Sequence, residues 1–221
     1  WAEYILAYSL VTTLRCLPRT AAENMSAGAA KLLDKGVPRL RRIARQNLAM
    51  ALPELDAAKR EAIADGTFRS IGRLLLAMAR FPSLDASNIG AWIAYDGLEH
   101  YMAAKQSGRG VLVATAHLGN WELSAFAHAL MTEPMNVMAR PLDNRLIDRL
   151  VEKRRTLSGN RLIFKRDAAR AVLKALRNNE AVGVLIDQNT SESEGVFVDF
   201  FGRQACAGAG FVKLAYRSQA Q

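Results

Sequence analysis

The sequence predicts an α/β fold, in which helices flank a mainly parallel sheet behind a helical N-terminal region. Short apolar runs alternate with stretches of helical periodicity between residues 111 and 186, as in strand–helix–strand units. Residues before position 90 show only helical patterns. The chain has 221 residues, half of them hydrophobic, which is enough for one substantial core. We therefore expect a helical region over residues 1–90 and an α/β core over residues 91–221.

The first segment, residues 1–14, is largely apolar and is followed by Arg15. It is shorter than the roughly 20 apolar residues that span a bilayer. Trp1, Tyr4 and Tyr8 near one end are typical of a membrane interface. The sequence leaves three interpretations open: an interfacial helix, the remnant of a membrane anchor, or a helix buried in the globular domain. No basic stretch precedes the segment, so we do not expect a cleavable signal peptide.

Helical patterns continue through the rest of the first region. They cover residues 21–33, 37–50, 57–64 and 68–80. The second of these helices has arginines on or near one side, with Pro53 just after its end. These arginines are Arg39, Arg41, Arg42 and Arg45. The basic side is either an ordinary solvated face or a surface that docks onto anionic membrane or substrate phosphates.

From residue 98 onward, helices and strands alternate. The expected strands are 111–116, 135–139, 161–164 and 181–186. The expected helices are 98–106, 122–130, 145–158 and 168–178. This alternation favours a parallel sheet covered on both faces, with functional residues at the carboxyl ends of its strands.

Composition restricts the partners of the chain. Its 30 Lys and Arg residues exceed its 21 Asp and Glu residues, giving a net charge of +9. Phospholipid surfaces, phosphorylated glycolipids, acidic carrier proteins and nucleic acids would all suit this charge. Nucleic acid is disfavoured, because no recognisable binding module is present and the aromatic residues lie within apolar runs. Cys16 and Cys206 lack the spacing of a metal site, and we expect both to serve packing.

A histidine follows the first predicted strand, and a glutamate follows it five residues later. Imidazole can take a proton from a hydroxyl when a carboxylate holds its other nitrogen, so His117 and Glu122 are a candidate base and partner. Gly119 permits a tight turn, and Asn120 can cap a helix that begins near Trp121. The same spacing also fits a strand end and a solvated helix start. Arg140 and Asp187 likewise follow predicted strands directly.

Several blocks resemble those of the bacterial lipid A biosynthesis (lauroyl/myristoyl) acyltransferases, within the lysophospholipid acyltransferase superfamily. In chain order they are RRIARQNL at 41–48, AHLGNWE at 116–122, VMARPLDN at 137–144, Arg154-Arg155 with Gly159, VGVLIDQN at 182–189 and VFVDFFGR at 196–203. One block alone would be weak evidence for this family, but six blocks in the same order are a specific resemblance. The resemblance implies a glycerolipid acyltransferase-like fold, with the catalytic core in residues 91–221. The family continues with further strands and helices, so it also implies a chain truncated at its C-terminus.

The resemblance also implies the roles of the candidate catalytic residues. His117 would be the general base and Glu122 would orient it. Arg155, or alternatively Arg154, would neutralise an acceptor phosphate or stabilise the oxyanion. Asp187 would fix an arginine or bind hydroxyls of the acceptor. No metal or redox cofactor is implied.

Four further residues are candidates for substrate binding. Arg140 is placed to recognise phosphate, and Asn144 would either position substrate or cap the next helix. Asn120 and Gln188 complete this set. One departure concerns residues 206–210, where the family usually has hydroxyl side chains and this chain has CAGAG. Any contact that those hydroxyls make in the family is therefore in doubt here.

The predicted function is transfer of a fatty acyl group from an acyl carrier protein, or from acyl-CoA, to a hydroxyl of a lipid A precursor or related anionic glycolipid. The enzyme would act at the cytoplasmic face of the inner membrane. An acyltransferase for phosphatidylinositol mannoside or glycerophospholipid is the alternative within the same chemistry. A non-catalytic basic module that docks on membranes or nucleic acid is the alternative outside it. An α/β hydrolase is disfavoured because no Gly-x-Ser-x-Gly motif is present.

Overall fold

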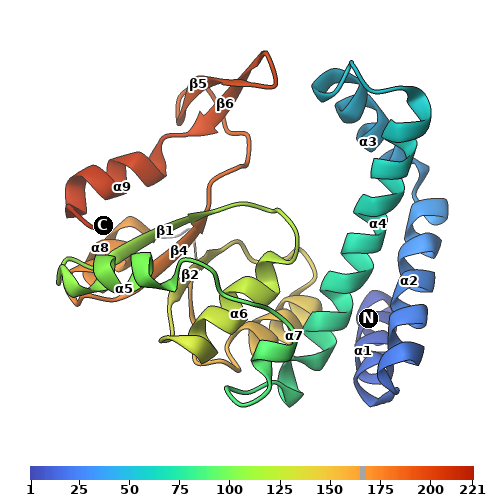
Figure 1. Cartoon of the computed structure of the whole chain (residues 1–221), viewed down its shortest axis with the longest axis horizontal. Coiled ribbons are helices and arrows are strands. Elements are labelled where there is room, and N and C mark those ends of the chain that lie inside the picture. The colour runs from blue at the N-terminus through green and yellow to red at the C-terminus, as the bar shows by residue number, and fades with distance from the viewer. Residues whose placement is uncertain (165–167) are drawn as a thin grey trace.

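A four-stranded parallel sheet lies at the centre of the computed structural model, which describes residues 1–164 and 168–221 (Figure 1). The strands of this sheet are β1 (Val111–Thr115), β2 (Asn136–Ala139), β3 (Arg161–Phe164) and β4 (Ala181–Leu185). Their spatial order is β1-β4-β2-β3, so β4, the last of them in sequence, lies between β1 and β2. The predicted α/β class and the four predicted strands are confirmed.

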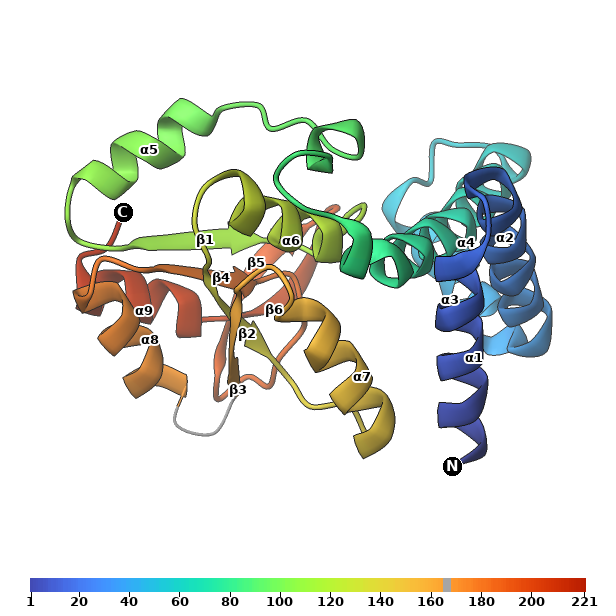
Figure 2. The same cartoon turned by 90° about the horizontal axis from the view of Figure 1, so that it is seen from below.

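Helices cover both faces of this sheet, on opposite sides in Figure 2. They are α5 (Leu98–Gln106), α6 (Trp121–Met131), α7 (Arg145–Arg155), α8 (Ala168–Arg177) and α9 (Gly210–Ser218). Leu112 and Val182 are paired in register and pack with α8 and α9. Their neighbours Val111 and Ala181 point the other way and pack with Tyr101 of α5. Successive side chains of a strand alternate between faces, which explains why these fully apolar strands suit a sheet covered on both sides.

The N-terminal region is built from helices, as predicted. They are α1 (Ala2–Cys16), α2 (Arg19–Gly36), α3 (Pro38–Ala51) and α4 (Ala57–Arg80). The prediction of separate helices over 57–64 and 68–80 is wrong, because α4 runs unbroken through both. Its buried Ala64, Phe68, Gly72 and Leu76 recur every four residues along one stripe. Burial of this stripe outweighs the cost of about 1 kcal/mol for Gly66 in mid-helix.

Helix α1 is packed at one end and exposed at the other. Val11 and Leu14 are buried against α2 and α4, whereas Trp1 and Leu6 are exposed. Among the described residues, we find no helix whose length and apolar character would carry it across a bilayer.

Contacts at the end of α4 join the helical region to the α/β core. Phe81 of the short helix η1 (Phe81–Ser83) stacks on Phe126 of α6, with ring centroids 4.0 Å apart. A second short helix, η2 (Ile89–Ala91), adds Ile89 to the same cluster. The first helices and the sheet are thereby tied together through α6.

A hairpin of β5 (Gly195–Phe200) and β6 (Arg203–Gly208) lies apart from the central sheet, and the sequence had not predicted its strands or α9 (Figure 1). Its turn has positive φ at Phe201 (54°) and Gly202 (68°), which matches the twist of a two-residue hairpin turn. Phe197, Phe200 and Phe201 are more than half exposed. Their exposure explains why no core-facing alternation marks these strands in the sequence.

Candidate active site

The pairing of β1 with β4 brings His117 and Asp187 together. Thr115 of β1 lies opposite Leu185 of β4, so the residues two positions further on leave the sheet side by side. The strands are parallel, so both side chains emerge at the carboxyl edge, where α/β sheets gather their functional groups. Gly119, with a φ of 61°, then turns the chain into α6 as predicted.

Asp187 holds His117 through both of its carboxylate oxygens. Oδ1 lies 2.9 Å from Nδ1 of the imidazole, and Oδ2 accepts the backbone N–H of His117 at 2.8 Å. Because an ionised carboxylate only accepts, this network assigns the proton to Nδ1 and leaves Nε2 as a proton acceptor. The Trp121 ring packs against the imidazole in a T-shaped arrangement, with 5.1 Å between centroids. The arrangement is that of an oriented general base.

Asp187 stays ionised in this setting. Partial burial acts to raise the pKa of its carboxyl, but hydrogen bonds from the side chain and backbone of His117 outweigh this and lower the pKa below its usual value. About a third of each side chain remains exposed, so substrate can reach the pair.

The structure therefore differs from the expected contact between Glu122 and His117, because Asp187 occupies that position. Of the two roles expected for Asp187, its carboxylate contacts His117 rather than an arginine, and the binding of acceptor hydroxyls stays a prediction. Glu122 is buried, and Arg155 binds both of its oxygens: Nε to Oε2 at 2.9 Å and Nη2 to Oε1 at 2.5 Å. Burial acts to lower the pKa of Arg155, but the Glu122 carboxylate outweighs it and raises that pKa. A guanidinium has five N–H donors and this contact uses two; the described residues include no hydrogen-bond partner for the other three.

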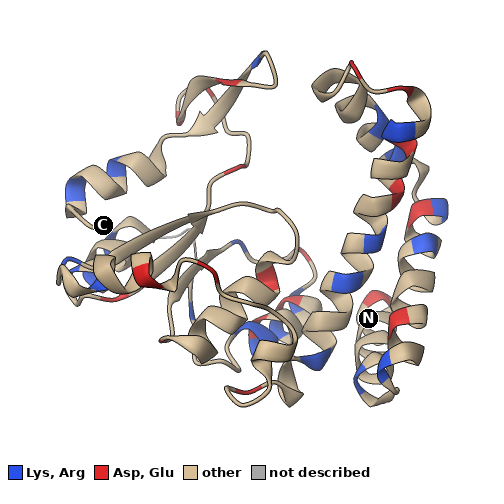
Figure 3. Ribbon diagram, in the orientation of Figure 1, with Lys and Arg blue, Asp and Glu red and all other residues tan. Residues whose placement is uncertain are grey.

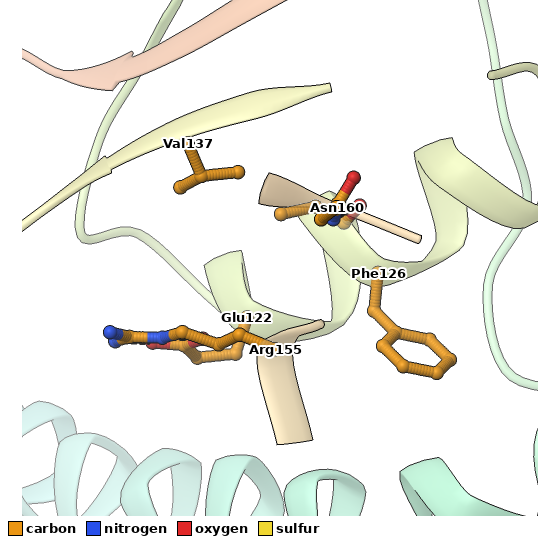
Figure 4. A pocket seen from close by; sticks show the side chains of 6 residues that line it. Glu122, Phe126, Val137, Arg155 and Asn160 are labelled. Atoms are coloured by element: carbon orange, nitrogen blue, oxygen red, sulfur yellow. Dashed lines mark hydrogen bonds and ion pairs between the residues drawn. The ribbon is translucent and has the colours of Figure 1, made fainter. Parts of the chain in front are cut away.

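A small cavity lies beside the Glu122–Arg155 pair, as Figure 4 shows with Phe126, Val137 and Asn160 around it. Its volume of about 20 Å³ is enough for one water molecule. Asn160 is buried, accepts from the N–H of Met135 and donates to the carbonyl of Ala125. It thereby fixes α6 to the sheet next to Glu122, and its only sequence signal was a polar residue directly before a predicted strand.

Arg154 and Arg155 diverge, as consecutive residues of a helix must. Arg154 is buried and donates from Nη1 to the carbonyls of Met78 (3.1 Å) and Ala79 (2.8 Å) at the end of α4. Those carbonyls lack partners within the helix and favour a cation. Arg155 therefore points toward Glu122, whereas Arg154 binds backbone carbonyls of α4. The expectation that Arg154 contacts substrate does not fit this buried position.

The remaining candidates lie at the carboxyl edge or cap a helix there. Asn120 caps α6 by accepting from the N–H of Leu123 at 3.1 Å, as predicted. Asn144 caps α7, also as predicted, and its amide donates to Glu3 of α1 at 2.9 Å. Arg140 directly follows β2, Gln188 lies three residues after the end of β4, and both are exposed. An exposed cation and amide at this edge are accessible to a polar substrate.

Comparison with known proteins shows which family the chain belongs to. A family model described as "Bacterial lipid A biosynthesis acyltransferase" matches residues 1–221. The chain belongs to that family. The match extends over the N-terminal helices as well as the α/β core.

Individual relatives of this family member carry related names. It is 30% identical over 159 residues to the lipid A biosynthesis palmitoleoyltransferase of Escherichia coli K12, covering 72% of this chain and 51% of the relative. It is 29% identical over 205 residues to the lipid A biosynthesis lauroyltransferase of the same bacterium, covering 92% and 66% respectively. A phosphatidylinositol mannoside acyltransferase of Mycolicibacterium smegmatis is 26% identical over 212 residues, covering 94% and 68%. The chain thus spans about half to two thirds of the length of these relatives.

Proposed function

We propose that the protein transfers a fatty acyl group from a thioester donor to a hydroxyl of a lipid A precursor or related anionic glycolipid. Membership of the lipid A acyltransferase family supports the reaction class. The observation that carries the mechanism is the contact of His117 with Asp187 at the exposed carboxyl edge of the sheet, which favours the tautomer with the proton on Nδ1, so that Nε2 of the neutral ring is the nitrogen that can accept a proton.

In the proposed reaction, Nε2 of His117 removes the proton of the acceptor hydroxyl as its oxygen attacks the carbonyl carbon of the thioester. Asp187 keeps the imidazole in the required tautomer and stabilises the imidazolium that forms. The tetrahedral intermediate collapses with cleavage of the C–S bond, and the imidazolium returns its proton to the leaving thiolate. The products are an ester and a free thiol, and no acyl-enzyme is formed.

Arg155 is proposed to stabilise negative charge, either on the oxyanion or on a phosphate of the acceptor. Glu122 holds its guanidinium on one edge, which fixes the direction of the remaining donors. In this proposal Glu122 is a positioning residue for Arg155, whereas Asp187 takes the role beside the base. Arg140 and Gln188 would meet the polar part of the acceptor, with Asn120 and Asn144 shaping the loops around it.

The donor is proposed to be an acyl carrier protein thioester or acyl-CoA, and the site of action the cytoplasmic face of the inner membrane. Relatives named phosphatidylinositol mannoside acyltransferase favour a second candidate with the same chemistry and another anionic glycolipid as acceptor.

An acceptor panel tests the proposal. The complete protein is given acyl carrier protein thioester or acyl-CoA, with a lipid A disaccharide precursor, phosphatidylinositol mannoside or a lysophospholipid as acceptor. We expect product with the lipid A precursor, and none above background from a His117→Gln control. Preference for phosphatidylinositol mannoside would establish the second candidate, and transfer to none of the acceptors would refute both.

A further inference from the structure

The outward face of α3 has a composition that the catalytic site does not explain. This 14-residue helix contains four arginines and no acidic residue, and none of its side chains, all of which the structure describes, is fully buried. The sequence left open whether its arginines form a solvated face or a docking surface. The structure divides them into two pairs with different surroundings.

Basic and acidic segments lie next to each other where α3 meets α4 (Figure 3). The inward pair of arginines joins α3 to its neighbours. Arg41 binds Asp34 of α2 at 2.6 Å and Asp65 of α4 at 2.6 Å, and it also contacts Glu61. Arg45 binds Glu61 at 2.7 Å. These contacts lower the pKa of Glu61 to about 2, with the Arg45 hydrogen bond as the largest cause. The three carboxylates that pack against α3 are therefore each paired with an inward arginine.

The outward pair, Arg39 and Arg42, is exposed. Exposed apolar side chains lie beside Arg39 on the same side of the helix: Ile43 is 40% exposed and Met50 is 38% exposed. Positions 39, 43, 46 and 50 are spaced by four, three and four residues, which places them on one stripe of a helix. Leu40 borders this stripe and is 40% exposed.

Exposed basic and apolar side chains are also present at the end of α2. Only Val37 separates α2 from α3, and Leu32 near this corner is 73% exposed beside the exposed Lys31 and Lys35. We define the α3 surface as the exposed basic and apolar side chains of this corner and of the outward stripe. Its members are Lys31, Leu32, Lys35, Val37, Arg39, Leu40, Arg42, Ile43 and Met50.

We propose that the α3 surface binds an anionic phospholipid bilayer, with its apolar side chains among the headgroups and its cations on the lipid phosphates. The proposal rests on the proposed function, since a lipid acceptor requires the enzyme to work at a membrane. The support is charge complementarity: the surface has four exposed cations, and the one acid within it, Asp34, is bound by Arg41. Basic and apolar residues interleaved on an outward helix are the pattern of interfacial helices.

Vesicle co-sedimentation of the complete protein tests this surface. The variant is Arg39→Ala/Arg42→Ala, and the matched control is Arg170→Ala/Lys174→Ala, which removes the same charge from exposed positions of α8. A basic side chain near an anionic membrane contributes about fivefold in affinity, so the α3 variant should bind phosphatidylglycerol-containing vesicles about 30-fold more weakly. The control should bind like the wild type, and all binding should weaken with salt.

A second variant, Leu40→Ser/Ile43→Ser, tests the apolar contribution and should bind more weakly at every salt concentration. Circular dichroism checks that each variant is folded. The proposal is overturned if Arg39→Ala/Arg42→Ala binds anionic vesicles as tightly as the α8 control. It is also overturned if that variant keeps vesicle binding and instead loses affinity for acyl carrier protein, because the occupant would then be an acidic protein.

Failure of this proposal can be told apart from failure of the proposed function. A His117→Ala variant should bind vesicles like the wild type, since the α3 surface does not include the catalytic edge. Conversely, Arg39→Ala/Arg42→Ala should keep its turnover on detergent-dispersed acceptor, where no bilayer has to be bound. Loss of that turnover would refute membrane docking as the role of the surface.

Discussion

Replacing Asp187 with asparagine should distinguish the carboxylate that contacts His117 in the structure from Glu122, which the sequence had indicated for that role. Asp187 accepts from Nδ1 at 2.9 Å and from the backbone N–H at 2.8 Å, whereas the amide that replaces it has a single acceptor oxygen. One of the two N–H groups would then face the amide NH₂. The imidazole can relieve this by moving its proton to Nε2, which removes the base.

The expected loss is large. In serine proteases the equivalent aspartate-to-asparagine change lowers kcat by about 10⁴, and general-base catalysis typically contributes about 10²–10⁴. We expect Asp187→Asn to lower kcat by about 10³–10⁴, equivalent to about 4–5 kcal/mol of transition-state stabilisation. Steady-state transfer from acyl carrier protein thioester to the lipid A precursor measures this loss. The ¹⁵N chemical shifts of the His117 ring report its tautomer directly.

Glu122→Gln is the matched comparison, because it makes the same chemical change in the carboxylate that binds Arg155. It should reduce transfer by weakening the hold on Arg155, while the His117 tautomer remains that of the wild type. The reasoning would be refuted if Asp187→Asn kept both turnover and tautomer and Glu122→Gln changed the tautomer instead.

Three further predictions concern stability. Arg154→Met should lower the free energy of unfolding by about 2 kcal/mol in urea titrations, because two carbonyls at the end of α4 lose a charged donor; unchanged stability would show that they are solvated instead. Gly72→Ala should destabilise by about 1 kcal/mol net: its new Cβ would lie 2.9 Å from the backbone oxygen of Ser26, and a helix-propensity gain of about 1 kcal/mol offsets only part of the resulting strain. A more stable Gly72→Ala protein would contradict this close approach of α2 and α4. Folding lowers the pKa of Glu61 from 4.5 to about 2, so its contribution to stability is complete above about pH 4.5 and is lost as the pH falls toward 2. Thermal melts across this range should therefore show a smaller acid-induced loss for Glu61→Gln than for the wild type, and equal losses would count against the ion pairs.

The sequence predicted the fold class because its strands are buried on both faces and therefore appear as continuous apolar runs. It also predicted the caps Asn120 and Asn144, since capping depends on residues within three positions of each other. It wrongly predicted two helices in place of α4, with a break near Gly66. The helix is continuous there because a stripe of buried residues packs against the neighbouring helices, and this packing is not visible in the local sequence.

The partner of His117 could not be predicted in the same way. Asp187 is 70 residues away, and the two meet only because β4 inserts between β1 and β2. Strand order depends on tertiary packing and leaves no local signal in the sequence. Because Glu122 is close to His117 in sequence, the sequence favoured a contact between these two residues. In the structure Glu122 contacts Arg155 instead. The separate roles of Arg154 and Arg155 likewise depend on which neighbours α7 packs against.

The central claim is that His117 is the base in acyl transfer. The most direct test is single-turnover transfer from acyl carrier protein thioester to the lipid A precursor by His117→Ala, with its folding verified against the wild type. The account predicts a rate about 10²–10⁴ below wild type with the acceptor still bound. Transfer within a few fold of wild type would contradict it and would show that a group other than His117 acts as the base.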